Sequence, residues 1–131
     1  MSIQESLCYA AQAGDEKEVR SLLEQGVDPD SRMPDGMTAL AQSVYWSRNP
    51  RVVKLLIEAG AEVNATNGAG IPVISLAAER GNSEAVRLLV EAGADKNAAD
   101  TEGSTPLMYA TASSGLPESI QEEIVRLLQA D

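Results

Sequence analysis

The side chains that most often carry out catalysis or bind metal ions are scarce in this sequence. It contains no histidine and a single cysteine, Cys8. Without histidine, the usual nucleophile–base pairs cannot be assembled, and most zinc sites lose a required ligand. We therefore predict that the chain is not an enzyme and has no catalytic, metal-binding or cofactor-binding residue. Cys8 fits a packed structural thiol, with a reactive or exposed thiol as the alternative.

Two local patterns resemble ligand sites only in part. Asp28, Asp30 and Asp35 gather three carboxylates in one short segment, but their spacing differs from that of a calcium-binding EF-hand loop. Gly68 and Gly70 lack the third glycine and the preceding strand of a dinucleotide-binding loop. Both patterns therefore predict solvated turns.

The composition is strongly acidic. Twenty Asp and Glu residues stand against ten Lys and Arg residues, which gives a net charge of −10. This charge repels nucleic-acid phosphates and anionic membrane surfaces, so we expect neither as a ligand. A protein partner with a neutral or basic contact surface fits better. The alternative is that the acidity only supports solubility.

No targeting or membrane segment is recognisable in the sequence. No apolar run reaches the roughly 18 residues of a membrane span. Residues 1–12 lack the basic and apolar regions of a secretory signal. A lone cysteine cannot form an internal disulfide, which is typical of a reducing compartment. We therefore expect a cytoplasmic protein.

The elements that would position any binding side chains are set by an internal repeat. Residues 52–70 align with residues 85–103 at an offset of 33, and residues 18–36 fit the same frame. The aligned pairs are apolar residues, glycines and an asparagine, and they include Val53/Val86, Leu55/Leu88, Leu56/Leu89, Gly60/Gly93, Asn64/Asn97 and Gly70/Gly103. Residues 124–128 repeat the apolar core a fourth time. Self-similarity at this period indicates stacked repeats.

Each repeat is predicted to contain two short helices and an extended turn. In the third repeat we expect a first helix over 73–80, with small buried residues, and a second helix that is capped by Ser83 and ends near Ala92. Gly93 then takes a left-handed conformation. Residues 94–104 run extended and reverse at 100–103.

The sequence resembles the ankyrin-repeat family. Thr105-Pro106-Leu107-Met108-Tyr109-Ala110 resembles the Thr-Pro-Leu-His-x-Ala signature, and residues 91–98 resemble the ankyrin helix exit. The resemblance implies an all-α solenoid of four helix-turn-helix repeats joined by β-hairpin-like loops. We place these repeats at about 3–36, 37–70, 71–103 and 104–131, within one domain over 1–131.

Several positions depart from the family pattern. The signature histidine is replaced in every repeat, and the residues at its position are Cys8, Ala41, Ser75 and Met108. The hydrogen bonds of that histidine must therefore be absent or replaced. The connection between the two helices is lengthened at 47–50 in the second repeat and at 113–119 in the fourth. In the fourth repeat we expect a loop and an extra helical turn, with Pro117 in the first turn of the last helix.

The resemblance implies a concave binding surface, which is built from the hairpin tips and the exposed side of the inner helices. We expect an apolar centre there with a charged rim, comprising Met37, Tyr45, Trp46 and Ile71, then Asp35, Glu79, Arg80 and Glu102, with Ser104 at a neighbouring tip. Aromatic residues contribute a large share of interface hot spots. In the alternative, Trp46 folds over the 47–50 turn and Tyr45 packs between helices.

The predicted function is a protein-interaction module, acting as a small stand-alone adaptor or inhibitor. Because the chain ends directly after the fourth helix core, we expect a complete small protein. We also expect a monomer. One alternative is an immunity-type inhibitor of a cognate toxin or enzyme. A second alternative is a self-associating scaffold, extended through an exposed terminal repeat.

Overall fold

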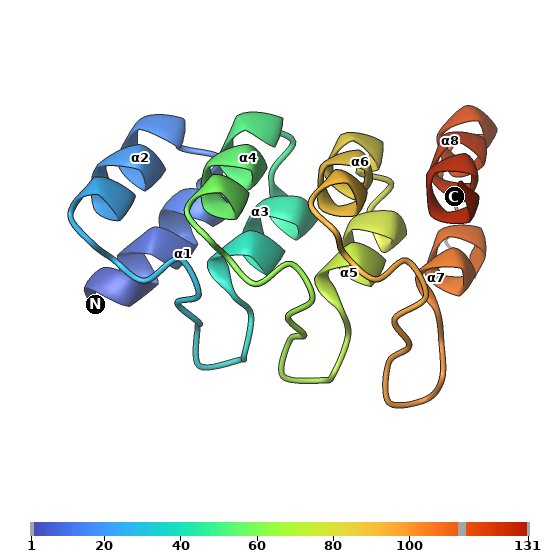
Figure 1. The fold of residues 1–131 in the computed structure, drawn as a ribbon, viewed down its shortest axis with the longest axis horizontal. Coiled ribbons are helices and arrows are strands. Elements are labelled where there is room, and N and C mark those ends of the chain that lie inside the picture. The colour runs from blue at the N-terminus through green and yellow to red at the C-terminus, as the bar shows by residue number, and fades with distance from the viewer. Residues whose placement is uncertain (1, 113–114, 131) are drawn as a thin grey trace.

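The computed structural model describes residues 2–112 and 115–130. These residues form eight helices, which follow one another as four stacked pairs (Figure 1). The helices are α1 Ile3–Ala13, α2 Glu16–Glu24, α3 Ala39–Trp46, α4 Pro50–Glu58, α5 Val73–Glu79, α6 Ser83–Glu91, α7 Pro106–Ala112 and α8 Glu118–Gln129. The prediction of an all-α repeat solenoid is confirmed, and we number the helix pairs repeats one to four.

The helices form two rows. The inner row contains α1, α3, α5 and α7, and the outer row contains α2, α4, α6 and α8. Long loops leave the outer helices and project beyond the inner row before each next inner helix begins (Figure 1). Two of these loops carry an isolated antiparallel bridge, Arg32 to Thr38 and Thr66 to Pro72. These two loops are therefore hairpin-like, at the place where the sequence predicts extended turns.

Polar side chains begin most of the helices. Thr38 Oγ1 accepts the Ala41 N–H at 3.0 Å, and Asn82 Oδ1 accepts the Ala85 N–H at 3.2 Å. The prediction that Ser83 caps α6 is therefore wrong by one residue. Asn82 is equally suited to the role, and its amide has further partners in repeat two. Pro117 likewise lies just before α8, at the N-cap, rather than inside its first turn.

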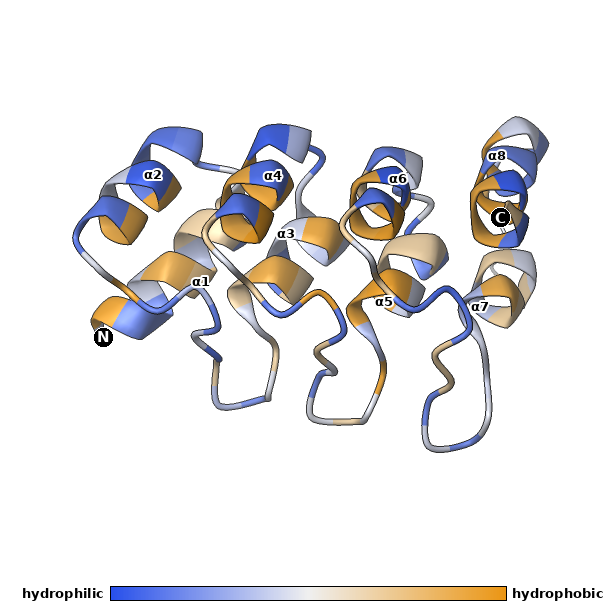
Figure 2. Cartoon of the chain, viewed as in Figure 1, coloured by the Kyte–Doolittle hydropathy of each residue, from blue (hydrophilic) through white to orange (hydrophobic). Residues whose placement is uncertain are grey.

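The core lies between the two rows. Figure 2 shows the outer helices apolar on the side that faces the inner row and polar on the opposite side. The predicted small residues of α5 are buried, since Ala77 and Ala78 expose 0% of their surface. Small side chains there allow neighbouring inner helices to approach closely. Gly93 has φ +94°, as its predicted left-handed role requires.

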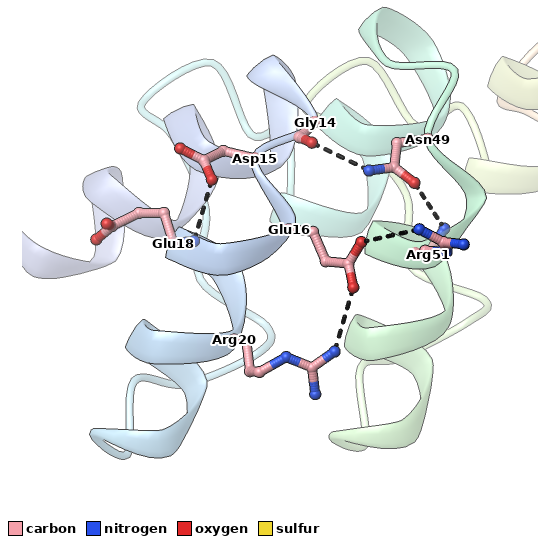
Figure 3. A network of polar contacts seen from close by, with 7 residues as sticks. All are labelled: Gly14, Asp15, Glu16, Glu18, Arg20, Asn49 and Arg51. Atoms are coloured by element: carbon pink, nitrogen blue, oxygen red, sulfur yellow. Dashed lines mark hydrogen bonds and ion pairs between the residues drawn. The ribbon is translucent and has the colours of Figure 1, made fainter.

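Asparagine side chains join repeat one to repeat two and repeat two to repeat three. Asn49 Nδ2 donates to the Gly14 carbonyl at 3.1 Å, while its Oδ1 accepts the Arg51 N–H (Figure 3). Asn82 Nδ2 donates to the Val44 and Ser47 carbonyls at 3.1 and 3.3 Å. These carbonyls lie at the ends of inner helices, where no intrahelical donor is available. Each of these asparagine side chains therefore caps its own helix and also donates to a backbone carbonyl of the preceding repeat.

Charged pairs cover the outer side of the junction between repeats one and two. Glu16 receives Arg20 at 3.2 Å and Arg51 at 3.8 Å, so one carboxylate on α2 contacts both outer helices (Figure 3). The Arg51 side chain is 79% exposed. Exposed ion pairs contribute about 0–1 kcal/mol. The junction is therefore held mainly by its apolar core and the asparagine.

An apolar contact joins repeats three and four. A Cβ atom added to Gly81 would lie 2.5 Å from Leu116 Cδ2, so Leu116 packs directly on this glycine. α8 is three residues longer than α6, twelve against nine. The predicted insertion at 113–119 therefore adds helix as well as loop, although residues 113 and 114 lie outside the described residues.

The missing histidines are compensated unevenly. Cys8 Sγ donates to the Ser31 carbonyl at 3.4 Å. Ser75 Oγ, by contrast, is buried and has no hydrogen-bond partner among the described residues. The interactions expected of the histidine are thus replaced at one position and absent at another. A buried hydroxyl without a partner costs about 1–3 kcal/mol.

Candidate partner-binding surface

A hollow opens on the inner side of repeats two and three. It has a volume of about 370 Å³. Its walls come from the C-terminal end of α3, from α5 and from two neighbouring hairpins, and its lining residues are Asp35, Met37, Tyr45, Trp46, Asn67, Ala69, Ile71, Leu76 and Glu79. We call it the first hollow. It brings together six of the nine residues that the sequence predicts as partner-binding.

Two aromatic side chains form one wall of the first hollow. The Tyr45 and Trp46 ring centroids are 4.9 Å apart, and the rings meet edge to face at 78°. Trp46 is 55% exposed, whereas Tyr45 is half-buried against the core. Tyr45 therefore both packs against the core and lines the first hollow. Trp46 presents more than half of its surface to solvent, so packing alone does not explain it.

Arg80 covers this aromatic pair. Its guanidinium carbon lies 4.9 Å from the Tyr45 ring centroid and 5.6 Å from that of Trp46. Arg80 Nε donates to the Tyr45 carbonyl at 3.0 Å, and the Arg80 carbonyl accepts from Arg48 Nη2 at 2.8 Å. Cation–π contacts of this kind contribute about 0.5–1 kcal/mol at exposed sites. Arg80 therefore holds the rings in place as well as contributing charge.

Side-chain hydrogen bonds hold the hairpin edge of the first hollow. Asn67 Oδ1 accepts the N–H groups of Ala69 and Ile71, both at 2.9 Å. Asp35 Oδ1 accepts the Met37 N–H at 2.9 Å. Met37 and Ile71 are half-buried and pack on the core. The apolar floor of the hollow is therefore preformed, which lowers the entropy cost of binding.

A second hollow lies one repeat further along the same face. Its lining residues are Asp100, Glu102, Ser104, Met108, Tyr109 and Ala112. Glu102 and Ser104 are thus separated from the other predicted partner-binding residues. They share the second hollow with Met108, which is 51% exposed.

A hydrogen bond organises the second hollow. Tyr109 Oη donates to Asp100 Oδ2 at 2.5 Å, and Asp100 Oδ1 accepts the Glu102 and Ser104 N–H groups at 2.9 Å. The tyrosine hydroxyl and these backbone donors hold the pKa of Asp100 below its usual value. Burial, the Asp100 contact and the charges of Asp100, Glu79 and Glu102 raise the pKa of Tyr109 to about 12. Tyr109 therefore stays protonated near neutral pH.

Cys8 is a packed thiol. Its side chain is 1% exposed. Burial, followed by the charges of Asp35 and Glu5, raises the pKa of Cys8 to about 11. A thiol in this state reacts poorly, because the thiolate is the nucleophile. The structure thus favours the structural reading of Cys8.

The sequence reasoning missed several residues of the two hollows. Asn67, Ala69 and Leu76 complete the first hollow, and Met108 and Tyr109 form the floor of the second. Leu76 and Tyr109 occupy the same register position on successive inner helices, so the repeat period relates these two missed residues to each other. Arg48, which lines neither hollow but donates to the Arg80 carbonyl, could not have been found, since that contact depends on the path of the lengthened turn.

Over the described ranges, 2–112 and 115–130, no group of three or more candidate metal ligands gathers. No helix in those ranges is both long and apolar enough to cross a membrane. The inner face of the stack carries two hollows, one over repeats two and three and one on repeat four.

The paired helices and projecting hairpins define a helical-repeat solenoid with a concave face. A family model described as ankyrin repeats (3 copies) matches residues 4–67 and 49–131. The chain belongs to the ankyrin-repeat family. Ankyrin repeats generally mediate protein–protein interactions, and proteins built from them are typically interaction modules rather than enzymes.

Curated relatives agree with this assignment. The chain is 41% identical to the mouse ankyrin repeat domain-containing protein 63 and 42% identical to its human counterpart, over 63% of this chain. It spans only 22% and 23% of the length of those two proteins. The Notch-regulated ankyrin repeat-containing protein of Xenopus tropicalis is 34% identical over 57% of this chain and 68% of its own length.

Proposed function

We propose that this protein binds one partner protein through the first hollow and acts as a monomeric adaptor or inhibitor in the cytoplasm. The observation that carries the proposal is Trp46. It is the single tryptophan of the chain, and it is 55% exposed beside a hollow with an apolar floor. A large exposed aromatic at a concave site is a typical interface hot spot. Ankyrin repeats bind proteins, which supports the same reading.

The charges of the site favour a neutral or basic partner surface. Asp35 and Glu79 line the first hollow, and the whole chain carries a net charge of −10. A basic partner would be steered toward such a surface, and its association rate would fall as ionic strength rises. An acidic partner would be repelled.

Affinity capture with matched baits tests the proposal. The full chain and a Trp46→Ala, Ile71→Ala double variant serve as baits in source-cell lysate. We expect the variant to lose a partner that the unmodified chain retains, because truncating a hot spot costs about 2 kcal/mol or more. Tyr9→Ala is the control, since Tyr9 is 45% exposed on α1 in repeat one and lies outside the lining of the first hollow.

The outcomes separate clearly once circular dichroism shows that each bait is folded. Loss of the partner with the double variant and retention with Tyr9→Ala would support binding at the first hollow. Equal capture by all three baits would refute it. Sedimentation of the unmodified chain tests the monomer, because a mass that rises with concentration would favour a self-associating scaffold instead.

A further inference from the structure

The two hollows differ in their cations. Each is lined by two carboxylates, Asp35 and Glu79 in the first and Asp100 and Glu102 in the second, but Arg80 lies over the aromatic wall of the first. Glu79 on α5 is also close enough to the second hollow for its charge to act on Tyr109. None of the six described residues that line the second hollow is a cation. Met108, which is 51% exposed, adds apolar surface. This combination suits a side chain with an apolar stem and a cationic head, as in lysine or arginine.

The first hollow suits an apolar side chain. Met37, Ile71 and Leu76 supply its floor. The Arg80 guanidinium already covers the Tyr45 and Trp46 rings, so an incoming cation would meet a like charge there. The two hollows therefore select different side chains along one face.

The hairpin edges restrict the backbone of the occupant. The Ala69 and Ile71 N–H groups are taken by Asn67, and the Glu102 and Ser104 N–H groups are taken by Asp100. A partner strand could not pair with these donors to extend the hairpins. A polyproline II segment does not require backbone hydrogen bonds to the hairpins, because its own backbone groups remain solvated.

The spacing of the inner helices, which carry the two hollows one repeat apart, fits this conformation. Neighbouring packed helices lie about 8–10 Å apart, and α3, α5 and α7 are neighbours in the inner row. A polyproline II segment advances about 3.1 Å per residue with three residues per turn, so every third side chain returns to the same side after about 9 Å. In a strand, same-side residues are about 6.6 or 13 Å apart, which matches less well.

We infer that the occupant is an extended basic segment of a partner protein, with an apolar side chain in the first hollow and a lysine or arginine in the second, three residues apart. This inference rests on the proposed function and adds the chemistry of the partner. Its distinguishing element is the second hollow, which the capture experiment leaves intact.

Synthetic peptides test the inference on the full chain. The probe is a fluorescent proline-rich nine-residue peptide with leucine and arginine three positions apart. Comparison peptides replace arginine with glutamine or glutamate, or set the pair two, four or seven positions apart. Binding is measured by anisotropy and by the emission of Trp46, which lines the first hollow. We expect the first peptide to bind best and to weaken at high ionic strength.

Two double variants distinguish the effect of the charges in the second hollow from the effect of the net charge of the chain. Asp100→Asn, Glu102→Gln removes two charges from the second hollow, and Asn67 already makes the corresponding turn bonds in the preceding repeat. Glu24→Gln, Glu91→Gln removes two exposed charges from the outer helices. We expect the first variant to weaken arginine-peptide binding by about threefold to tenfold, as for two exposed ion pairs, and the second to leave it nearly unchanged.

Each result has one meaning. Selective loss with the second-hollow variant, confined to the arginine peptide, would support the inference. Equal binding of arginine, glutamine and glutamate peptides, equal weakening by both double variants, a preference for the seven-residue helical spacing, or no peptide binding would overturn it. A partner captured through Trp46 under any of those results would leave the proposed function standing.

Discussion

Two neighbouring junctions of the stack are held by different contacts. One joins repeats two and three, and the other joins repeats three and four. At the first, Asn82 donates to the Val44 and Ser47 carbonyls, and Arg80 donates to the Tyr45 carbonyl. At the second, Leu116 packs directly on Gly81. One junction satisfies the carbonyls at the end of an inner helix with side-chain donors from the next repeat, and the other packs a leucine on a glycine.

The difference bears on the binding surface. The carbonyls that Asn82 and Arg80 satisfy end α3, the helix that carries Tyr45 and Trp46. The hydrogen bonds between repeats two and three therefore hold the aromatic wall of the first hollow in place. Binding there would cost little side-chain conformational entropy. In the second hollow, order comes from the hairpin instead, where Tyr109 donates to Asp100. Rigidity at the two hollows thus has separate sources.

The largest effect is expected from Asn82→Ala. The change strips donors from two carbonyls and removes the α6 N-cap, at a site where Asn82 is 8% exposed. We expect the free energy of unfolding to fall by about 2–3 kcal/mol. Leu116→Ala should cost about 1 kcal/mol, because Leu116 is half-exposed and no polar group loses its partner. Urea denaturation measures both, and equal losses would remove the distinction between the junctions.

Gly81→Ala tests the apolar junction directly. Gly81 has φ +68°, so a side chain there is strained by about 1–2 kcal/mol and also meets Leu116. Gly26→Ala is the control, since Gly26 has φ +90° and nothing within 4 Å of an added Cβ. We expect Gly81→Ala to cost about 1 kcal/mol more than the control. Adding Leu116→Ala should abolish this excess, and an excess that persists would assign it to another contact.

Tyr109→Phe tests the source of order at the second hollow. The Tyr109 hydroxyl is the largest cause of the lowered pKa of Asp100, so the Asp100 pKa should rise in the variant. A carboxylate with a lowered pKa adds stability above its unfolded value, near 3.8, and this contribution disappears as pH falls through the folded value. The stability gap between the two proteins should therefore narrow below pH 3.8. Carbon NMR of the Asp100 carboxyl measures the pKa, and an unchanged value would contradict the assignment.

The smallest effect is expected from Arg87→Ala, on the outer face of the junction between repeats three and four. Arg87 lies 3.5 Å from Glu123 in α8 and 3.2 Å from Glu84 in its own helix. The Arg87 side chain is 44% exposed, so the loss should be a few tenths of a kcal/mol and should vanish at high ionic strength. A loss above about 1 kcal/mol that persists in salt would mean that ionic contacts support this junction after all.

Most residues of the candidate site could be predicted from the sequence, but their division between two hollows could not. Trp46 and Ile71 were predicted as partner-binding because large apolar residues stand at inner-helix ends and hairpin tips, and both line the first hollow. Glu102 and Ser104 were predicted for the same surface but lie in the second hollow. Register along the repeat identifies the face on which a residue lies. It does not identify where one hollow ends and the next begins, because that depends on the side chains between them.

The sequence by itself determined the period, the helix pairs and the core, because these follow from local regularities. Apolar spacing sets which helix face is buried, and glycines set where the chain turns. Only the tertiary structure decided between Asn82 and Ser83 as the α6 cap. It also placed Arg80 over Tyr45 and Trp46. These outcomes depend on contacts between residues more than thirty positions apart, such as Asn82 with Val44, and no local pattern encodes such a contact.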